Sequence, residues 1–174
     1  FNGIISDLGL TLDLGEEFDK IGVNFKAAAG REYAASRGEY LNGIILANYL
    51  GFTFIDAAKA IFFDNKGKFD DDITNACLGA MLDKAEKAVI PGFYGAMPDG
   101  TIKTFSRGGS DFTGSVVAKA AVASMYENWT DVSGFLMADP RIVKDAQPID
   151  TITYRELREL SYMGATVLHE DAIF

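Results

Sequence analysis

The sequence predicts an α/β layer fold, and two observations support this prediction. From about Gly51 onward, short apolar runs typical of strands alternate with longer amphipathic runs typical of helices. In addition, 48% of the 174 residues are apolar and 12% are aromatic, which is enough to bury a core of single-domain size. The sequence shows no internal repeat, linker or low-complexity tract, so we expect one domain.

The N-terminal part is predicted to be mostly helical. Residues 1–25 mix Leu and Ile with Gly and Asp without a dominant period, which favours short helices and loops. A long helix is expected from Lys26 to Tyr49, because its apolar residues mostly share one helical face. Gly51 follows where a C-terminal cap belongs. The polar residues 36–38 suggest a break in this helix.

The middle of the chain alternates between the two element types. Residues 52–56 and 60–64 are β-rich runs and are predicted to be strands. Residues 71–86 begin with acids and end with lysines, the charge order that favours a helix. A buried strand at 88–93 ends at a Pro-Gly turn, and a strand with alternating character follows at 101–105 after a Pro-Asp-Gly turn.

The C-terminal part continues the alternation. An Ala-rich helix is expected at 113–126, followed by a strand, a turn and a second short strand within 128–140. Residues 153–164 combine a threonine cap, helical leucine spacing and a closing glycine, which predicts a helix. Residues 165–169 would then form a last strand.

The net charge and the cysteine content limit which partners and which cellular compartment we expect. A net charge of −9 disfavours nucleic acid and anionic membranes as partners, since both would repel the average surface. The single cysteine, Cys77, cannot form an internal disulfide, and no basic–apolar secretory signal opens the chain. No apolar run approaches the ~20 residues of a transmembrane helix. We therefore expect a soluble cytoplasmic protein.

The turn Phe-Ser-Arg-Gly-Gly-Ser-Asp-Phe-Thr, residues 105–113, is the strongest candidate for a site. A glycine-rich turn between a strand and a helix directs unpaired N–H groups and the positive end of the helix dipole at one point. Gly108 and Gly109 would let an anion approach the backbone, and Arg107 offers a planar donor fork for a carboxylate or phosphate. The pattern therefore suits an anion site.

The same turn has a simpler interpretation. Ser110 or Asp111 would be an ordinary N-terminal cap, and the glycines would only make a tight turn. The spacing matches neither a Walker A loop nor a dinucleotide-binding fingerprint, so spacing alone leaves both interpretations open.

Five short motifs, taken in order and at their separations, resemble aspartokinases, and together they cover most of the chain from about Glu32. They are Ser-Arg-Gly-Glu-Tyr (36–40), the Pro-Gly-Phe to Pro-Asp-Gly segment (91–100), Ser-Arg-Gly-Gly-Ser-Asp (106–111), Trp-Thr-Asp-Val-Ser-Gly to Ala-Asp-Pro-Arg-Ile-Val (129–143) and Glu-Leu-Ser-Tyr-Met-Gly-Ala (159–165). The resemblance implies the amino acid kinase fold, a three-layer α/β/α sandwich with a largely parallel central sheet. Residues 1–174 would be part of one catalytic domain, without an ACT regulatory domain.

The resemblance also implies an activity and a substrate site. Aspartokinases transfer the γ-phosphoryl group of ATP to the side-chain carboxylate of L-aspartate, the first step toward lysine, threonine and methionine. By motif, Glu39 would bind the substrate's α-amino group, Arg107 its carboxylate, and Asp111 would be catalytic. The residues that would line the reacting groups are Gly108, Gly109 and Ser110.

The nucleotide would bind elsewhere in the motifs, with Mg²⁺ as the accompanying cation and no dedicated protein metal site. The ATP-binding positions implied by the resemblance are Thr130, Asp131, Leu136 and Arg141. Leu136 and Met137 replace a tyrosine and a threonine that are usual in the family, and Thr166 replaces a frequent lysine. The full-length protein is expected to be a homo-oligomer.

One family motif has no counterpart in the chain. The family opens with Lys-Phe-Gly-Gly, whose lysine contacts the transferred phosphoryl group, and we expect the given sequence to begin downstream of it and to be inactive alone. The alternative is a non-catalytic ligand-binding or regulatory domain of the same fold. Kinases of this fold that act on glutamate, carbamate or UMP are disfavoured, because Glu39 and the turn at 107–111 match the aspartate pattern.

Overall fold

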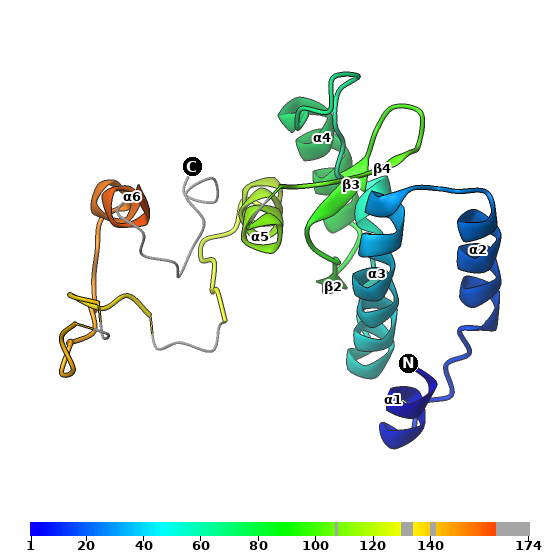
Figure 1. The fold of residues 1–174 in the computed structure, drawn as a ribbon, viewed down its shortest axis with the longest axis horizontal. Helices are drawn as coiled ribbons and strands as arrows, with labels where there is room; N and C mark the ends of the chain where they lie inside the picture. The colour runs from blue at the N-terminus through cyan, green and yellow to red at the C-terminus, as the bar shows by residue number, and fades with distance from the viewer. Residues whose placement is uncertain (107, 130–133, 140–141, 163–174) are drawn as a thin grey trace.

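A computed structural model of the protein describes residues 1–106, 108–129, 134–139 and 142–162 (Figure 1). The N-terminal helices are α1 (Asn2–Asp7), α2 (Gly15–Lys26) and α3 (Arg31–Leu50). The following elements are β1 (Thr53–Phe54), the short 3-10 helix η1 (Ala57–Lys59), α4 (Asp71–Leu82), β2 (Ala88–Val89), β3 (Tyr94–Ala96), β4 (Ile102–Thr104), α5 (Gly109–Ala120) and α6 (Tyr154–Tyr162).

The strands form two pairs. β1 and β2 run in parallel, with Thr53 opposite Ala88, and α4 lies in the connection between them. A parallel pair joined through a helix is the α/β arrangement that the sequence predicts, and the predicted α/β class is confirmed. β3 and β4 form an antiparallel hairpin, and its turn contains Gly100 at a φ of +82°.

The strand β3 has no counterpart among the predicted elements. Its three residues are too few for a period to show, and long-range contacts define it instead. The Ala96 N–H donates to the Ile61 carbonyl at 2.9 Å, and a Cβ on Gly95 would collide with that same carbonyl. The prediction of a regular strand at 60–64 is wrong, because these residues form isolated bridges such as Phe62 with Ala96.

The long helix α3 agrees with the prediction at its end and differs at its start. Gly51 adopts the left-handed conformation at a φ of +68° and caps α3, as expected. The helix begins at Arg31 instead of Lys26, which ends α2. Gly30, at a φ of +92°, separates the two helices, because this backbone conformation cannot continue a helix.

The predicted break of α3 around residues 36–38 is wrong. Ser36 and Arg37 are buried, and the Ser36 hydroxyl donates to the Tyr33 carbonyl one turn earlier at 2.8 Å. Polar residues continue the helix here because their side chains find partners inside the protein. The sequence pattern does not reveal those partners.

Helices α4 and α6 are close to their predicted positions. The side chain of Asp70 caps α4 by accepting from the Ile73 N–H at 3.1 Å. Thr153 and Glu156 form a capping box at the start of α6, which confirms the threonine cap. None of the helices in the described part of the chain is long and apolar enough to cross a membrane.

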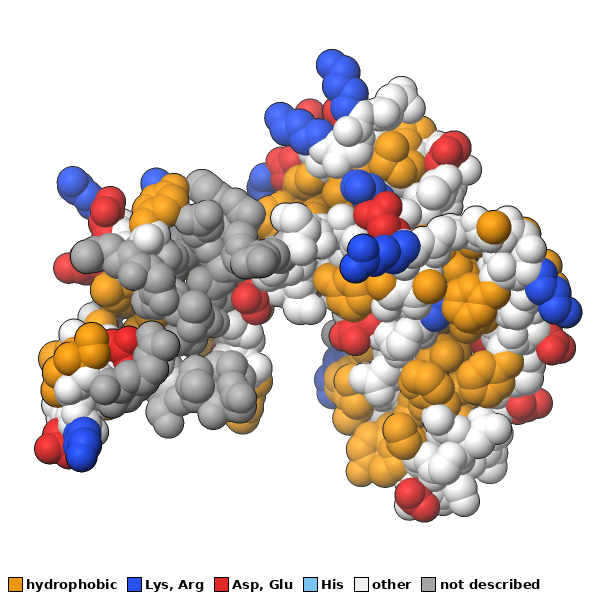
Figure 2. Space-filling view, in the orientation of Figure 1, with side chains coloured by type: hydrophobic (Ala, Val, Ile, Leu, Met, Phe, Trp, Pro, Cys, Tyr) orange, Lys and Arg blue, Asp and Glu red, His pale blue; other side chains and the backbone are white. Residues whose placement is uncertain are grey.

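The layers follow from how the helices pack on the strands. α3 lies on one side of the strands and α5 on the other, while α6 lies apart (Figure 1). The main core gathers around Ile61, Leu78 and Tyr94, and a second core around Leu14 and Leu41 joins the N-terminal helices to α3. Apolar side chains are also exposed over α1 to α3 (Figure 2), among them Phe1, Ile4, Val23, Phe25 and Leu46.

Candidate functional site

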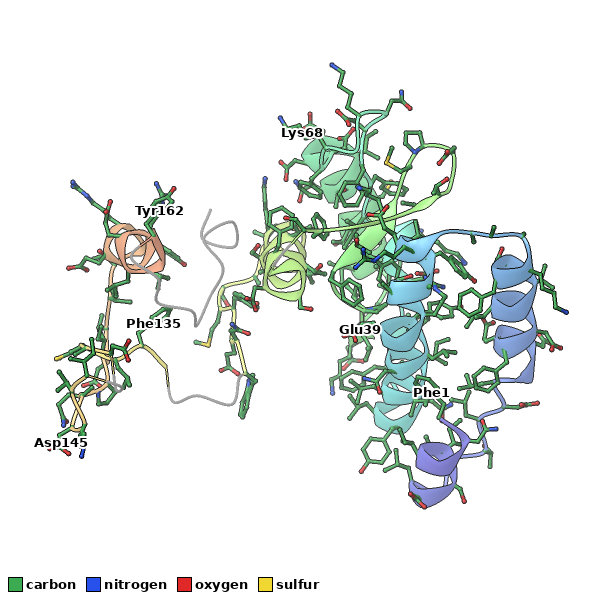
Figure 3. All side chains as sticks on the ribbon, in the orientation of Figure 1. Phe1, Glu39, Lys68, Phe135, Asp145 and Tyr162 are labelled. Carbon is green, nitrogen blue, oxygen red and sulfur yellow. The ribbon has the colours of Figure 1, made fainter. Side chains whose placement is uncertain are left out.

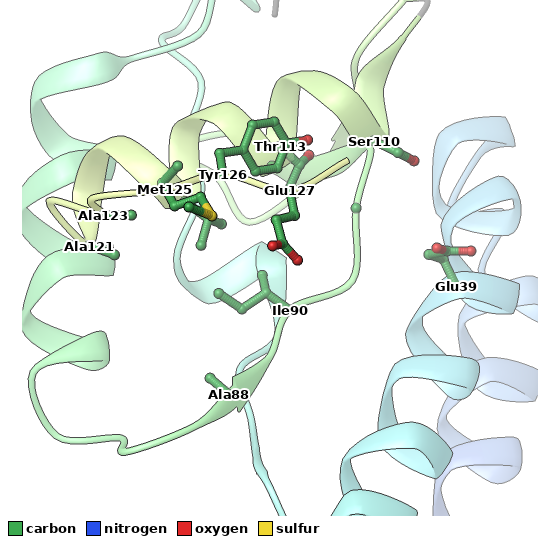
Figure 4. Close-up of a pocket in the computed structure, with 14 residues that line it drawn as sticks. Glu39, Ala88, Ile90, Ser110, Thr113, Ala121, Ala123, Met125, Tyr126 and Glu127 are labelled. Carbon is green, nitrogen blue, oxygen red and sulfur yellow. The ribbon is translucent and has the colours of Figure 1, made fainter. Parts of the chain in front are cut away.

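A pocket of about 540 Å³ opens between α3 and α5 beside the end of β2 (Figure 4). Its lining comes from segments that are far apart in the sequence: Glu39 on α3; Ala88, Ile90 and Gly92; Ser110, Thr113, Gly114, Val117 and Ala118 on α5; and Ala121, Ala123, Met125, Tyr126 and Glu127. Most of these side chains are apolar or small, and the polar ones are Glu39, Ser110, Thr113, Tyr126 and Glu127.

The start of α5 rules out one of the two interpretations of the turn. The N-cap residue is Gly108, in the left-handed conformation at a φ of +60°, and no side chain caps this helix. Ser110 and Asp111 therefore lie within the first turn, so the interpretation as a simple side-chain cap is wrong. The predicted helix start at Thr113 is also wrong, because α5 begins at Gly109. An uncapped helix start leaves its N–H groups available to an anion.

Gly109 has a packing role that the sequence does not show. It is buried, and an added Cβ would lie 2.8 Å from the Cβ of Phe93 and 3.0 Å from that of Phe105. Glycine is therefore required for α5 to approach the hairpin formed by β3 and β4. The sequence suggested ligand clearance as the reason for glycine at this position, whereas the structure shows close packing.

We expect Gly109→Ala to destabilise the protein by about 1–3 kcal/mol, because the new methyl group must displace two ring-bearing residues. Chemical denaturation measures the change. The matched control is Gly22→Ala in α2, where nothing lies within 4 Å of an added Cβ. That control should stabilise by up to about 1 kcal/mol through helix propensity. Equal effects of the two substitutions would contradict the packing role.

Thr113 holds the loop before β3 against α5. Its buried hydroxyl accepts from the Phe93 N–H at 3.0 Å and donates to the Gly109 carbonyl at 2.7 Å. Gly92, in the same loop, lies so close to Ser110 that a Cβ would meet the Ser110 Cα at 3.2 Å. The loop therefore packs directly under the first turn of α5.

Glu39 and Ser110, two of the predicted substrate-binding residues, line the same pocket. Figure 4 shows Glu39 projecting from α3 and Ser110 from the start of α5, on the same side of the pocket, and Figure 3 shows Glu39 on the side of α3 toward α5. Among the described lining residues, the two that carry charge are Glu39 and Glu127, both acidic. The charged part of the lining therefore suits a ligand with an ammonium group.

Asp111 lies in the first turn of α5, where the helix dipole favours a negative charge. It is partly buried, and its carboxylate accepts from the Asn128 side-chain amide at 3.5 Å. Burial, followed by the negative charge of Asp111, raises the pKa of the neighbouring Tyr126 hydroxyl. Asp111 is thus next to the pocket and is electrostatically coupled to one of its lining residues.

The apolar half of the pocket was not predicted from the sequence. Ile90, Val117 and Tyr126 form much of it, and the Tyr126 ring packs directly over Gly114. The small residues of the Ala-rich helix are the signal that could have indicated a groove. Ile90 carries no comparable local signal, because a buried strand residue looks the same whether or not it faces a cavity.

Several predicted residues lie outside the described part of the chain: Arg107, Thr130, Asp131 and Arg141, together with the predicted strand at 165–169. Leu136 is described, and its backbone forms an isolated bridge with Pro148. It is not among the residues that line the pocket. The nucleotide-binding roles of these residues stay predictions. Within the described residues, no group of three or more His, Cys, Asp or Glu side chains gathers as a metal site.

Comparison with known proteins identifies the family. Residues 4–174 match the amino acid kinase family. An aspartokinase of Chlamydia trachomatis is 31% identical over 98% of this chain and 41% of its own length. The crystal structure of Clostridium acetobutylicum aspartate kinase is 57% identical and has a TM-score of 0.92 over 98% of this chain and 39% of that one.

A second crystal structure, E. coli aspartokinase III in complex with aspartate and ADP, is 28% identical with a TM-score of 0.78, over 92% of this chain and 41% of that one. The chain thus spans about two fifths of the length of these relatives. The predicted amino acid kinase fold is confirmed by these superpositions. The chain belongs to the amino acid kinase family, and within that family it is similar to aspartokinases.

Proposed function

We propose that the protein is an aspartate kinase, which transfers the γ-phosphoryl group of ATP to the side-chain carboxylate of L-aspartate and yields 4-phospho-L-aspartate and ADP. The main support is that Glu39 and Ser110, which belong to motifs far apart in the sequence, line one pocket. The E. coli relative in complex with aspartate and ADP supports the same substrates. The step would be the first toward lysine, threonine and methionine.

The substrate's charges match the proposed residues. The Glu39 carboxylate would bind the α-ammonium group, and the Arg107 guanidinium would bind a carboxylate with two parallel hydrogen bonds. The first turn of α5, from Gly109 to Asp111, would offer its N–H groups to the phosphoryl group and the reacting carboxylate. A zwitterionic amino acid is therefore held from two sides.

Phosphoryl transfer requires positioning and neutralisation of charge more than covalent help from the protein. A side-chain carboxylate oxygen of aspartate forms the new bond to the γ-phosphorus, and the bond between that phosphorus and the β–γ bridging oxygen breaks, leaving ADP. Both reactants are anions, so the helix start, Arg107 and Mg²⁺ would reduce their repulsion. Asp111 would orient the reacting groups.

We propose that Mg²⁺ enters bound to the nucleotide. The ion prefers hard oxygen ligands and in such sites takes one or two carboxylates besides the phosphates. Asp111 next to the pocket and Glu127 in its lining provide carboxylate oxygens of this kind. Thr130, Asp131, Leu136 and Arg141 would bind the rest of the nucleotide. Residues 1–174 would form part of one catalytic domain in a cytoplasmic, homo-oligomeric protein.

We expect the full-length protein to produce the β-hydroxamate of L-aspartate when it is incubated with L-aspartate, MgATP and hydroxylamine, because hydroxylamine displaces phosphate from 4-phospho-L-aspartate. A parallel hydroxamate assay contains L-glutamate in place of aspartate, and UMP, whose phosphorylation yields no acyl phosphate, is tested by the formation of ADP. Turnover with glutamate or UMP but not with aspartate would refute the proposal. Binding of aspartate in calorimetry without any turnover would instead indicate a non-catalytic domain of the same fold.

A further inference from the structure

Arg37 is a buried arginine that lies among three tyrosine rings. Its side chain belongs to α3, two residues before Glu39, and is only 8% exposed. The guanidinium carbon lies 4.5 Å from the ring centroids of Tyr33 and Tyr40 and 5.4 Å from that of Tyr94. We call these three rings the tyrosine cage. The Nε and Nη2 atoms also donate to the Ser36 hydroxyl at 3.1 and 2.9 Å.

The tyrosine cage is itself held by three hydrogen bonds to two other segments. The Tyr40 hydroxyl donates to Glu17 of α2 at 2.8 Å, and the Tyr94 hydroxyl donates to Asp56, before η1, at 2.9 Å. Asn24 of α2 donates to the Tyr33 hydroxyl at 2.8 Å. The guanidinium therefore lies where α2, α3, β3 and the segment after β1 meet.

The tyrosine rings of the cage and the carboxylates hydrogen-bonded to two of their hydroxyls both favour the positive charge of Arg37. Burial raises the pKa values of Tyr40 and Tyr94 above the usual tyrosine range, so both hydroxyls stay protonated and keep donating. A guanidinium over an aromatic face is stabilised most when water is excluded. Lysine would lose the planar stacking, because its ammonium is a compact point charge.

A short chain of contacts connects the cage to the start of α5. Tyr94 of the cage is bonded covalently to Phe93, and the Phe93 N–H donates to the Thr113 hydroxyl. Thr113 in turn donates to the Gly109 carbonyl in the first turn of α5. Arg37, inside the cage, is thus two residues from Glu39, and Gly109, at the other end of these contacts, is next to Ser110.

We propose that Arg37 is a positioning residue, which sets the placement of Glu39 on α3 relative to the first turn of α5 by holding the tyrosine cage of α3 and β3 together. The inference rests on the proposed aspartate kinase function. It adds a residue that does not line the pocket but determines how well the pocket binds the amino acid. A misplacement of about 1 Å in such a site can cost about 100-fold in rate.

The test uses the full-length protein with Arg37→Met and Arg37→Lys, assayed by hydroxamate formation and by thermal unfolding. We expect the KM for L-aspartate to rise about 10-fold in both variants and the KM for MgATP to change by less than about 2-fold. Arg31→Met, at the exposed first residue of the same helix, is the matched control and should leave both constants unchanged.

A double variant separates positioning from general stability. If Arg37 acts through Glu39, adding Arg37→Met to Glu39→Gln should raise the KM for aspartate little further. The inference would be overturned if the two substitutions multiplied their effects on the KM for aspartate. It would also be overturned if the KM values for aspartate and MgATP rose in parallel, or if folded Arg37→Lys left both KM values unchanged. The wild-type protein is assayed in parallel. If the proposed function is wrong, the wild type does not turn over aspartate; if only the role of Arg37 is wrong, the wild type is active and the variants do not behave as expected.

Discussion

Asp111→Ala is expected to lower the kcat of aspartate phosphorylation by about 100- to 1,000-fold, the range found when a preorganised electrostatic group is removed. Asp111 lies in the first turn of α5, beside the pocket but not among its lining residues. Its role should therefore concern the transfer more than aspartate binding. Accordingly, the KM for L-aspartate should change by less than roughly 3-fold. Steady-state hydroxamate kinetics with the full-length protein measure both constants.

The control for this substitution is Asp72→Ala. Asp72 is an exposed acid in the first turn of α4 and is not among the residues that line the pocket, so its removal causes a similar loss of helix-dipole stabilisation outside the site. We expect this variant to keep its kcat. If Asp111→Ala weakened aspartate binding as much as it slowed turnover, Asp111 would be a binding residue and not a catalytic one.

Glu39→Gln is expected to raise the KM for L-aspartate by about 10- to 100-fold, which corresponds to about 1.5–3 kcal/mol for a hydrogen bond between charged groups. The physical reason is that Glu39 is one of two acidic residues among the described lining residues and would pair with the substrate's ammonium group. The kcat at saturating aspartate should change far less. Titration of initial rates against aspartate concentration measures this shift.

Glu32→Gln is the matched control, because Glu32 lies on the same helix and undergoes the same chemical change. Its carboxylate pairs with Lys103 at 3.0 Å and accepts from Thr104 at 3.1 Å, away from the pocket lining. We expect a loss of stability of at most about 1 kcal/mol and an unchanged KM for aspartate. A KM that rises equally in both variants would show that α3 as a whole, and not the Glu39 carboxylate, is responsible.

The features that the sequence predicted correctly are those set by neighbouring residues. Gly51 caps α3, and Thr153 begins a capping box with Glu156, because both depend on the backbone conformation or hydrogen bonds of a few adjacent residues. The motif containing residues 106–111 marked a candidate anion site, and that interpretation stays a prediction. The structure supports that interpretation by placing Gly108 as an N-cap that no side chain satisfies.

Other features could not be predicted, since they depend on distant parts of the chain. β3 exists because its backbone meets that of Ile61, and position 109 requires glycine because Phe93 and Phe105 leave no room for a side chain. In the same way, residues 36–38 continue α3 where a break was expected. Tyr94, more than fifty residues further along the chain, supplies one of the rings around Arg37.

The sequence by itself determined the α/β class, the helix caps and the motif residues of the site, since each depends on local propensity or on short patterns of residue types. Only the tertiary structure decided that Glu39 and Ser110 line one pocket, that Gly109 is required for packing, and that Arg37 lies in the tyrosine cage. The physical reason is that burial and contact depend on which segments pack together in space, and local sequence patterns do not show these long-range contacts.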